Sequence, residues 1–195
     1  MEAILSKIER TSSVDGLRGL EGAAARVYFA VLREAVPEEF AFKKRTRRPP
    51  GDPVNALLSL GYTLLYENIR TALEVVGLDP YVGFFHAQKY GRPALALDLA
   101  EEFRAPVVDS LVLTLVNKRM IQMKDFVRAD NGGLYLRARG MRTFLREFTD
   151  RLQTNVRHEQ VGRSLTYQKI FEVQARQVAK VVKGQEETYR AFRWR

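Results

Sequence analysis

Apolar residues recur at helical spacing in the first part of the chain. From Asp15 to about Ala35 they lie three or four positions apart, which predicts an amphipathic helix. The apolar positions of this helix are Leu17, Leu20, Ala24, Val27, Tyr28, Val31 and Leu32. A short helix is expected over residues 1–10, and the break at Thr11–Ser13 supplies side chains that can cap the helix that follows.

The strongest helix prediction begins at Asp52. Asp52 is a good N-cap, Pro53 suits the first helical position, and Gly77 is typical of a helix end. An unbroken apolar stripe lies between them, made of Val54, Leu57, Leu58, Gly61, Leu65, Ile69, Ala72 and Val76. This is the longest predicted helix, so we expect it to form the centre of the core.

The later patterns predict further helices and one hairpin. Apolar segments before and after Pro106 favour two helices with a kink between them. Residues 125–136 contain two short alternating runs around a glycine turn, which is typical of a β-hairpin. Amphipathic helices follow at residues 140–152 and 166–183. The predicted fold class is therefore mainly α, a multi-helix domain with a small β-hairpin near residues 125–136.

Composition agrees with an ordinary globular protein. The 195 residues are 46% hydrophobic and 28% charged, and they include no cysteine. No apolar run reaches the roughly 18 residues of a membrane span, so no membrane association is expected. The first residues lack the apolar segment of a secretory signal. A cysteine-free chain is compatible with a reducing environment, and we expect a cytoplasmic location.

The net charge of +9 is concentrated in two regions. The loop over residues 42–51 carries five basic residues and no acid: Lys43, Lys44, Arg45, Arg47 and Arg48. The rest of the excess lies beyond residue 136, including Arg142 and Arg146 on a predicted helix. A polyanion such as DNA is the partner that this distribution favours. We expect the loop to be mobile when free because its charges repel, and either a clamp on a phosphate backbone or a simple solvated loop fits it.

The end of the chain combines aromatic and basic residues. Tyr189, Phe192 and Trp194 stand among arginines in residues 189–195. Such a pattern suits stacking on bases. Packing of these aromatic residues back onto the protein's own core fits it equally well.

The candidate chemistry lies between residues 81 and 109. His86 precedes a loop, and Asp98 follows on a predicted helix with Glu101 and Glu102 three and four positions later. Residues at these spacings share one helical face, so either glutamate could join Asp98. A histidine beside phenylalanines is also common in ordinary protein cores.

Glu21 is the best further acid. It lies at the border of the apolar face of the helix over residues 15–35, among small residues that allow a metal or phosphate to come close. A glutamate with its head in water is the plain alternative. One imidazole and carboxylates from separate segments suit a divalent cation, with the oxygens favouring Mg²⁺ or Mn²⁺ and the nitrogen favouring Mn²⁺. Beside a basic surface, such a cation points to phosphodiester chemistry, by a nuclease or by a strand-transfer enzyme.

Four motifs occur in an order typical of one family. They are LRGLEGAAARVYF, DPVNALLSLGYTLLY, GLDPYVGFFHAQKYGRPALALDLAEEFRAPVVD and YQKIFEVQARQVAKVV. The chain resembles the CRISPR-associated integrase, the catalytic subunit of the spacer-acquisition complex, from about Val14 onward. By this resemblance Glu21, His86 and Glu101 are the catalytic metal ligands, Asp98 is an accessory acid, and Glu102 is not favoured.

The resemblance also implies a fold, an activity and partners. Residues 1–195 are expected to form a single helical catalytic domain, with residues 1–13 as a connecting helix and 164–195 as a C-terminal helix and basic aromatic tail. Members cut and join DNA with Mg²⁺ or Mn²⁺, acting on protospacer and CRISPR-array DNA as homodimers bound to a small second subunit. The N-terminal β-rich domain of the family has no counterpart here, so we expect either an excised domain or a natural short form that integrates weakly alone.

Two other classes of protein stay open from the residues alone. One is a catalytically idle DNA-binding helical module, in which the positive charge is the whole function. The other is a helical protein-interaction domain whose basic tail binds a protein.

Overall fold

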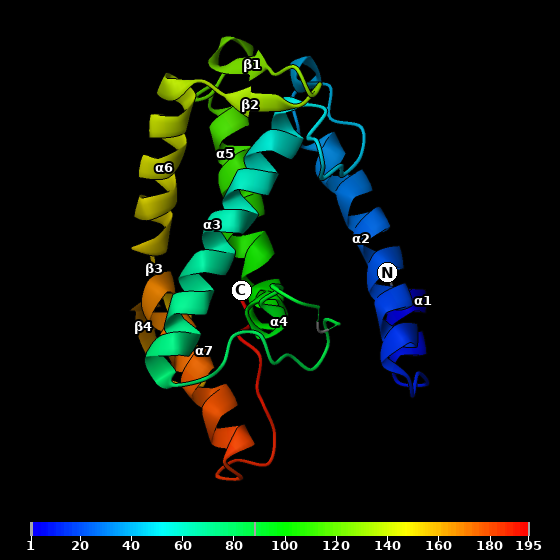
Figure 1. Ribbon diagram of the computed structural model, residues 1–195, viewed down its shortest axis with the longest axis vertical. Coiled ribbons are helices and arrows are strands. Elements are labelled where there is room, and N and C mark those ends of the chain that lie inside the picture. The colour runs from blue at the N-terminus through cyan, green and yellow to red at the C-terminus, as the bar shows by residue number, and fades with distance from the viewer. Residues whose placement is uncertain (1, 88, 195) are drawn as a thin grey trace.

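The structure is a computed structural model that describes residues 2–87 and 89–194. Figure 1 shows a mainly helical molecule in which two small β-hairpins join the helices. The helices are α1 (Glu2–Ile8), α2 (Val14–Glu34), α3 (Pro53–Val76), α4 (Ala94–Phe103), α5 (Ser110–Asn117), α6 (Ala138–Leu152) and α7 (Tyr167–Val182). The shorter turns are η1 (Glu38–Phe40), η2 (Arg104–Asp109) and η3 (Met123–Asp125). The mainly α fold predicted from the sequence is confirmed.

Helix α3 is the central element, and its local sequence sets both ends. The Asp52 side chain accepts a hydrogen bond from the backbone N–H of Asn55, Pro53 occupies the first turn, and Gly77 closes the helix in the left-handed region with φ of 82°. Helices α4 and α7 pack against α3, as do η2 and the strand β2 (Leu134–Leu136). Because these contacts surround α3, its apolar stripe forms the middle of one continuous core.

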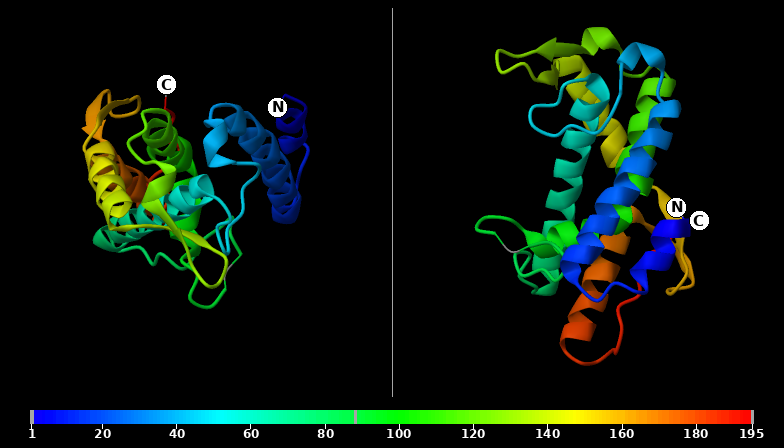
Figure 2. Two further views of the ribbon diagram at one scale, coloured as in Figure 1. Left: turned by 90° about the horizontal axis from the view of Figure 1, so that it is seen from above. Right: turned by 90° about the vertical axis from the view of Figure 1, so that its right-hand side faces the viewer.

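Helix α2 stands to one side of this core. Figure 2 shows α1 and α2 beside the body of the molecule rather than within it. Only Phe29 and Leu32 of α2 are buried, whereas Val27 and Val31 are 42% and 67% exposed. Val27 and Val31 share the predicted apolar spacing but lie at the surface, because α2 meets the body mainly through Phe29 and Leu32.

The chain bends sharply between α4 and α5. Figure 1 shows α4 almost end-on while α5 runs along the long axis. The expected kink at Pro106 takes the form of the π-helical turn η2, which accommodates a residue without an N–H group. The Pro106 carbonyl accepts hydrogen bonds from the Ser110 hydroxyl and from the Arg151 guanidinium.

Two antiparallel hairpins complete the fold. The predicted hairpin is formed by β1 (Phe126–Arg128) and β2, in the register Val127 opposite Tyr135. A second hairpin, β3 (Asn155–His158) with β4 (Arg163–Thr166), leads into α7 and was not predicted. Within the described residues, no helix is long and apolar enough to cross a bilayer.

Candidate active site

A cavity of about 280 Å³ lies between α2, α3 and the bend from α4 to η2. Its walls include two acids that the sequence singled out, Glu21 from α2 and Glu101 from α4. The other lining residues are Ala24, Ala25, Tyr28, Phe29, Tyr62, Arg104, Ala105 and Asp109. Segments far apart in the sequence thus bring two carboxylates to one concave surface.

Glu21 is exposed and unengaged. In the part of the chain that the structure describes, its carboxylate has no hydrogen-bond or ion-pair partner. The small residues Ala24 and Ala25, one turn further along α2, form the adjoining wall. A carboxylate free at the rim of a cavity can accept a cation without first losing a protein contact.

Glu101 is paired within the cavity. Both of its oxygens accept hydrogen bonds of 2.8 Å from Nη1 of Arg104. The Arg104 guanidinium also lies over the Tyr62 ring, 4.4 Å from its centroid. Burial opposes the charge of Arg104, but the Glu101 carboxylate outweighs it and keeps the arginine pKa above its ordinary value. Glu101 would therefore have to share or release Arg104 to bind a cation.

The base of the cavity holds a polar group that sequence reasoning missed. The buried carboxylate of Asp109 accepts hydrogen bonds from the hydroxyls of Tyr28 and Tyr62. Burial raises the pKa of Asp109 above its usual range, although the two phenols partly compensate. The available signal was an acid inside the apolar run of residues 106–116, whereas Tyr28 was recognised only as an apolar position of its helix.

His86 and Asp98 form a tightly bonded pair next to this cavity. Nδ1 of His86 lies 2.7 Å from Oδ1 of Asp98, and the backbone N–H groups of residues 84, 85 and 86 all donate to the same carboxylate. Burial disfavours the charge of Asp98, but these hydrogen bonds outweigh it and hold its pKa below the ordinary value. The contact uses Nδ1 and leaves Nε2 as the ring nitrogen that can bind a ligand.

The backbone at Gly83 makes this arrangement sterically allowed. A Cβ atom at Gly83 would lie 2.7 Å from the Asp98 carboxylate and from the Ala94 backbone. Any larger residue would push the loop away from α4. The same loop is tied to α2, because Arg18 donates hydrogen bonds to the carbonyl of Phe85. Since Arg18 lies one turn before Glu21, the His86 loop adjoins the face of α2 that carries Glu21.

The structure therefore brings together part of the predicted ligand set. Glu21 and Glu101 share the cavity, whereas His86 is not among the residues that line it. Within residues 2–87 and 89–194, no group of three histidine or acidic side chains is arranged to hold a metal ion as it stands. The donor types still fit a hard divalent cation, since two carboxylates face one space and Asp98 holds the adjoining imidazole.

Glu102 faces the opposite side of α4. Its carboxylate accepts hydrogen bonds from the Tyr189 hydroxyl, the backbone N–H of Phe192 and the Gln174 amide. Burial raises the pKa of Glu102, although these donors partly compensate. The aromatic tail thus packs back onto the protein, with the Phe192 ring stacked on Phe103 at 5.4 Å between centroids.

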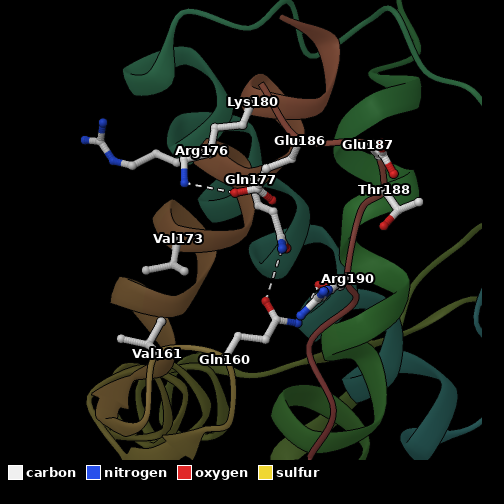
Figure 3. Close-up of a pocket in the computed structure, with 10 residues that line it drawn as sticks. All are labelled: Gln160, Val161, Val173, Arg176, Gln177, Lys180, Glu186, Glu187, Thr188 and Arg190. Atoms are coloured by element: carbon white, nitrogen blue, oxygen red, sulfur yellow. Dashed lines mark hydrogen bonds and ion pairs between the residues drawn. The ribbon is translucent and has the colours of Figure 1, made fainter. Parts of the chain in front are cut away.

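A second, larger cavity of about 640 Å³ lies on this tail side (Figure 3). It is formed by the β3–β4 turn, α7 and residues 186–190, and its lining mixes the bases Arg176, Lys180 and Arg190 with Glu186 and Glu187. Lys180 and Glu186 pair across it at 3.0 Å. The acids and bases largely neutralise one another, so this cavity has no clear preference for a charged ligand.

The basic loop is anchored to the start of α3. Phe42 is only 5% exposed, and Asn55 at the start of α3 bonds to the Lys44 carbonyl and the Thr46 N–H. Arg45 turns inward, where its guanidinium donates to Asn55 Oδ1 and to the Ser59 hydroxyl. Asn55 and Phe42 thus anchor the first half of the loop, which buries more than its sequence indicated, and its mobility when free stays a prediction.

Six other basic residues predicted to bind DNA remain at the surface. The exposed ones on the loop are Lys43, Lys44, Arg47 and Arg48. Arg142 and Arg146 are exposed on α6, where Arg146 pairs with Glu147 at 2.9 Å. Helix α6 lies across the molecule from α2 (Figures 1 and 2), so these two arginines belong to a different surface from the Glu21 cavity.

Sequence comparisons place these features in context. A family model described as CRISPR associated protein Cas1 matches residues 1–150. A relative from Thermus thermophilus, named CRISPR-associated endonuclease Cas1 3, is 47% identical over 191 residues, which are 98% of this chain and 57% of that protein. A relative from Chlorobaculum tepidum, named CRISPR-associated endonuclease Cas1 1, is 38% identical over 194 residues and is covered to the same 57%. This chain therefore spans little more than half the length of these relatives.

Solved structures show the same fold. A casposase bound to integration product superposes with a TM-score of 0.89 at 32% identity, over 95% of this chain and 52% of that one. A Cas1 protein from Thermotoga maritima gives a TM-score of 0.86 at 33% identity, over 94% of this chain and 56% of the other.

Proposed function

The chain belongs to the Cas1 family of CRISPR-associated proteins, and from this premise we propose a function for the cavity between α2 and α4. The protein is a divalent-metal-dependent DNA endonuclease and strand transferase of CRISPR adaptation. It joins DNA 3′-hydroxyl ends to phosphodiesters during spacer acquisition. The observation that carries the proposal is the convergence of Glu21 and Glu101 on one cavity next to the fixed His86–Asp98 pair.

The ligands of the metal are the carboxylates of Glu21 and Glu101 and Nε2 of His86. Carboxylate oxygens favour Mg²⁺ or Mn²⁺, and the imidazole nitrogen favours Mn²⁺. A divalent cation held there would supply Lewis acidity toward a phosphoryl group and its leaving oxygen. Asp98 acts as the accessory acid, since its bond to Nδ1 fixes the ring and directs Nε2 outward.

Arg104 and the two tyrosines have positioning roles. Arg104 orients the Glu101 carboxylate through its hydrogen bonds, and the same guanidinium would be placed to bind a phosphate oxygen of DNA in the cavity. Asp109 holds the hydroxyls of Tyr28 and Tyr62, which fixes the wall of the cavity beneath the reacting phosphate. Each of these groups therefore acts on the geometry of the site.

The exposed basic residues bind the DNA backbone. Lys43, Lys44, Arg47 and Arg48 provide one such surface, and Arg142 and Arg146 provide another on α6. Arg45 has a different role, because its charge is directed into the protein and fixes the loop to α3. DNA as the substrate agrees with a cytoplasmic location.

The partners follow from the solved complexes. The casposase is bound to an integration product, and two matching structures are complexes whose names join Cas1 with Cas2. We infer that this chain binds protospacer and CRISPR-array DNA and a small second subunit, and that it works as a homodimer.

A catalytically idle DNA-binding module is the second candidate, supported by the net charge of +9 and by the pairing of Glu101 with Arg104. Glu21→Gln separates the two functions, because within the described residues the Glu21 carboxylate has no hydrogen-bond or ion-pair partner whose loss would disturb the fold. We expect the variant to lose cleavage and strand transfer by about 100-fold or more while keeping its affinity for DNA.

The measurement uses a radiolabelled 3′-hydroxyl DNA and a supercoiled target, with Mn²⁺, Mg²⁺ or EDTA. Glu38→Gln, at an exposed acid of η1, is the control for the change in charge. Equal cleavage by Glu21→Gln and Glu38→Gln would contradict the catalytic function. Activity that persists in EDTA would contradict the proposed dependence on a divalent cation.

A further inference from the structure

Helix α2, which carries Glu21, is attached to the body of the molecule mainly near its C-terminal end. Phe29 and Leu32 are its buried residues, and the Phe29 ring packs edge-on against Phe42 of the basic loop at 6.5 Å between centroids. Further towards the N-terminus, the Glu21–Glu101 cavity of about 280 Å³ lies between α2 and the body. The half of α2 that bears Glu21 therefore has little apolar packing against the body, and its position depends on polar contacts.

Two side-chain hydrogen bonds tie α2 to the body on either side of Glu21. Nε of Arg18 donates to the Phe85 carbonyl at 2.9 Å, one turn before Glu21. The Tyr28 hydroxyl donates to Oδ2 of Asp109 at 2.6 Å, two turns after Glu21. Residues seven positions apart share one face of a helix, and Tyr28 accordingly lines the same cavity as Glu21.

Asp109 is a fixed anchor for this contact. It is 3% exposed at the end of η2, and its other carboxylate oxygen accepts a hydrogen bond from the Tyr62 hydroxyl of α3. Burial and the Asp109 charge raise the pKa of both phenols, so each hydroxyl remains a donor at neutral pH. One carboxylate thus joins α2, α3 and η2, and its bond from Tyr28 is the one that reaches out to α2.

The shape of α2 magnifies any movement at Tyr28. Leu32 is the buried residue nearest the C-terminal end of the helix, and from it Tyr28 lies about 6 Å along the axis and Glu21 about 16.5 Å. For a helix that pivots near Leu32, a displacement of about 1 Å at Tyr28 becomes about 3 Å at Glu21. Metal–ligand distances tolerate only about 0.2 Å, so such a shift would remove the Glu21 carboxylate from a cation bound to Glu101.

We propose that Asp109 is a positioning residue that sets, through Tyr28, the separation between the Glu21 and Glu101 carboxylates. The Tyr28–Asp109 hydrogen bond is a latch that holds the Glu21 half of α2 at a distance that one cation can bridge. Neither residue coordinates the cation in this role. The inference rests on the proposed function in taking Glu21 and Glu101 as ligands, but the position of α2 can be measured without metal or DNA.

The first experiment measures the position of α2 directly. The chain has no cysteine, so Gly19→Cys on α2 and Val75→Cys on α3 provide one pair of spin labels. A side chain at Gly19 meets open space and Val75 is 64% exposed, so both labels are accommodated at the surface. Double electron–electron resonance gives the distribution of distances between the labels. Tyr28→Phe, which loses only the hydroxyl, is expected to broaden this distribution and to shift its mean by about 2 to 4 Å.

Tyr62→Phe is the matched control for the distance measurement. It removes a hydrogen bond from the same carboxylate, but the donor belongs to α3 inside the body, so the distance between positions 19 and 75 should not change. Labels from Glu34→Cys and Val75→Cys report on the end of α2 beyond the pivot, and their distance should stay constant in both tyrosine variants.

Asp109→Asn tests the anchor itself and should reproduce the shift seen in Tyr28→Phe. Because Asp109 is buried, thermal unfolding first establishes whether this variant is folded. Tyr28 is 36% exposed, so Tyr28→Phe carries the test where Asp109→Asn does not fold.

The second experiment asks whether the latch acts on the cation site. Mn²⁺ binding is measured without DNA, from the electron paramagnetic resonance signal of the free ion. Tyr28→Phe is expected to weaken Mn²⁺ binding by about 10- to 100-fold, which is typical of residues that orient metal ligands. In strand transfer, the half-saturating Mn²⁺ concentration should rise accordingly, while the rate at saturating Mn²⁺ falls by less than about threefold. A purely structural role would lower the rate without changing the Mn²⁺ requirement.

Three outcomes would overturn the proposal. An unchanged distance in Tyr28→Phe would mean that packing alone places α2. Equal shifts in Tyr28→Phe and Tyr62→Phe would indicate a general loosening around Asp109. A shifted distance with unchanged Mn²⁺ binding, in a protein whose Glu21→Gln variant loses Mn²⁺, would mean that the latch does not position the ligand.

Failure of the proposed function gives a different result. In that case Glu21→Gln binds Mn²⁺ as well as the original protein does, and Glu21 is not a ligand. The distances between the spin labels still decide whether Tyr28 and Asp109 hold α2 in place.

Discussion

Glu101 and Glu102 are consecutive residues on one turn of α4, yet they serve two different regions. Glu101 faces the cavity beneath α2, where it is partly exposed and pairs with a single arginine. Glu102 faces the C-terminal tail, where three donors from the tail and α7 surround it. Glu101 can exchange its one ion-pair partner for another ligand, whereas the hydrogen bonds of Glu102 hold the C-terminal tail in place.

The two histidines show the same contrast. His86 is bonded through Nδ1 to a carboxylate and keeps 16% of its side chain exposed. His158 is 1% exposed, with Nε2 beside the Gln174 amide and its ring 5.7 Å from that of Phe192. Identical residue types therefore divide into a pair at or beside the candidate active site and a pair that contacts the C-terminal tail, according to what surrounds them.

The largest expected effect separates the two glutamates directly. Glu101→Gln should reduce DNA cleavage and strand transfer by about 100-fold or more, because an amide cannot replace a carboxylate ligand. Its free energy of unfolding should change by less than about 1 kcal/mol, since the lost ion pair is partly exposed. Activity assays with Mn²⁺ and thermal unfolding measure both quantities.

The matched control is Glu102→Gln, which should keep activity and lose stability instead. If both glutamines abolish activity equally, the division of α4 into two faces is wrong. If Glu101→Gln is fully active, Glu101 is not a ligand.

The next largest expected effect is on the free energy of unfolding, and it tests whether the C-terminal tail is docked on the protein. Phe192 is 6% exposed and packs against Phe103, Tyr167 and His158. Phe192→Ala should lower the free energy of unfolding by about 3 kcal/mol. Trp194→Ala, at a residue 58% exposed, should change it by less than about 0.5 kcal/mol. Chemical denaturation compares the two, and equal midpoints would mean that the tail is not docked in solution.

The dependence of stability on pH should have opposite signs in the two regions. The pKa of Asp98 is lowered, so its contribution is present above the unfolded pKa near 3.9 and is lost as pH falls through the folded pKa. The pKa of Glu102 is raised, so its contribution is largest near or below the unfolded pKa of about 4.3 and falls as pH rises through the folded pKa.

Substitution by the amide removes each contribution separately. The stability difference between the original protein and Asp98→Asn should shrink from about 2 kcal/mol as pH falls below about 4. The difference for Glu102→Gln should instead grow as pH falls from 7 toward 4, because the raised pKa of Glu102 favours the protonated, folded form. Denaturation at a series of pH values gives the slope of each stability difference against pH. Slopes of the same sign for Asp98→Asn and Glu102→Gln would contradict the opposite pKa shifts of these two acids.

The smallest effect concerns the basic loop. Replacing both Lys43 and Lys44 by alanine should reduce the slope of log affinity against log salt by about 1 to 2, because exposed lysines release counterions from DNA. Arg45→Ala should leave that slope unchanged and lower stability, since the Arg45 guanidinium bonds to Asn55 and Ser59. Measuring DNA affinity from 50 to 200 mM salt distinguishes the exposed lysines, which contact phosphates, from Arg45, whose guanidinium is directed into the protein.

Features set by local chemistry were predictable from the sequence. Asp52, Pro53 and Gly77 fix the ends of α3 through contacts within a few residues, and the hairpin near residues 125–136 follows from its glycine turn. The β3–β4 hairpin was missed because its strands alternate poorly between apolar and polar residues. In that segment Gly162 was the local signal, since it adopts the left-handed region at the turn.

Features set by distant contacts were not predictable. The partner of Glu102 lies 87 residues away at Tyr189, and the partner of Tyr28 lies 81 residues away at Asp109. Spacing alone left Glu101 and Glu102 equivalent, because both share a face with Asp98. The inward turn of Arg45 depends on its hydrogen bonds to Asn55 and Ser59, which the charge pattern of the loop does not indicate. Exposure of Val27 and Val31 depends on where α2 meets the body, which periodicity does not encode.

The distance between Glu102 and its tail partners has a consequence for synthesis. The ribosome makes α4 long before Phe192, which lies 90 residues further along. Until then, the Glu102 carboxylate lacks the tail residues that donate hydrogen bonds to it in the folded protein. The face of Phe103 that stacks on Phe192 is also uncovered. Since domains fold as their sequence emerges, this half of α4 is completed last. A prematurely terminated product would retain the Glu21 helix but display an uncovered apolar surface, which is the kind of feature that cellular proteases and chaperones detect.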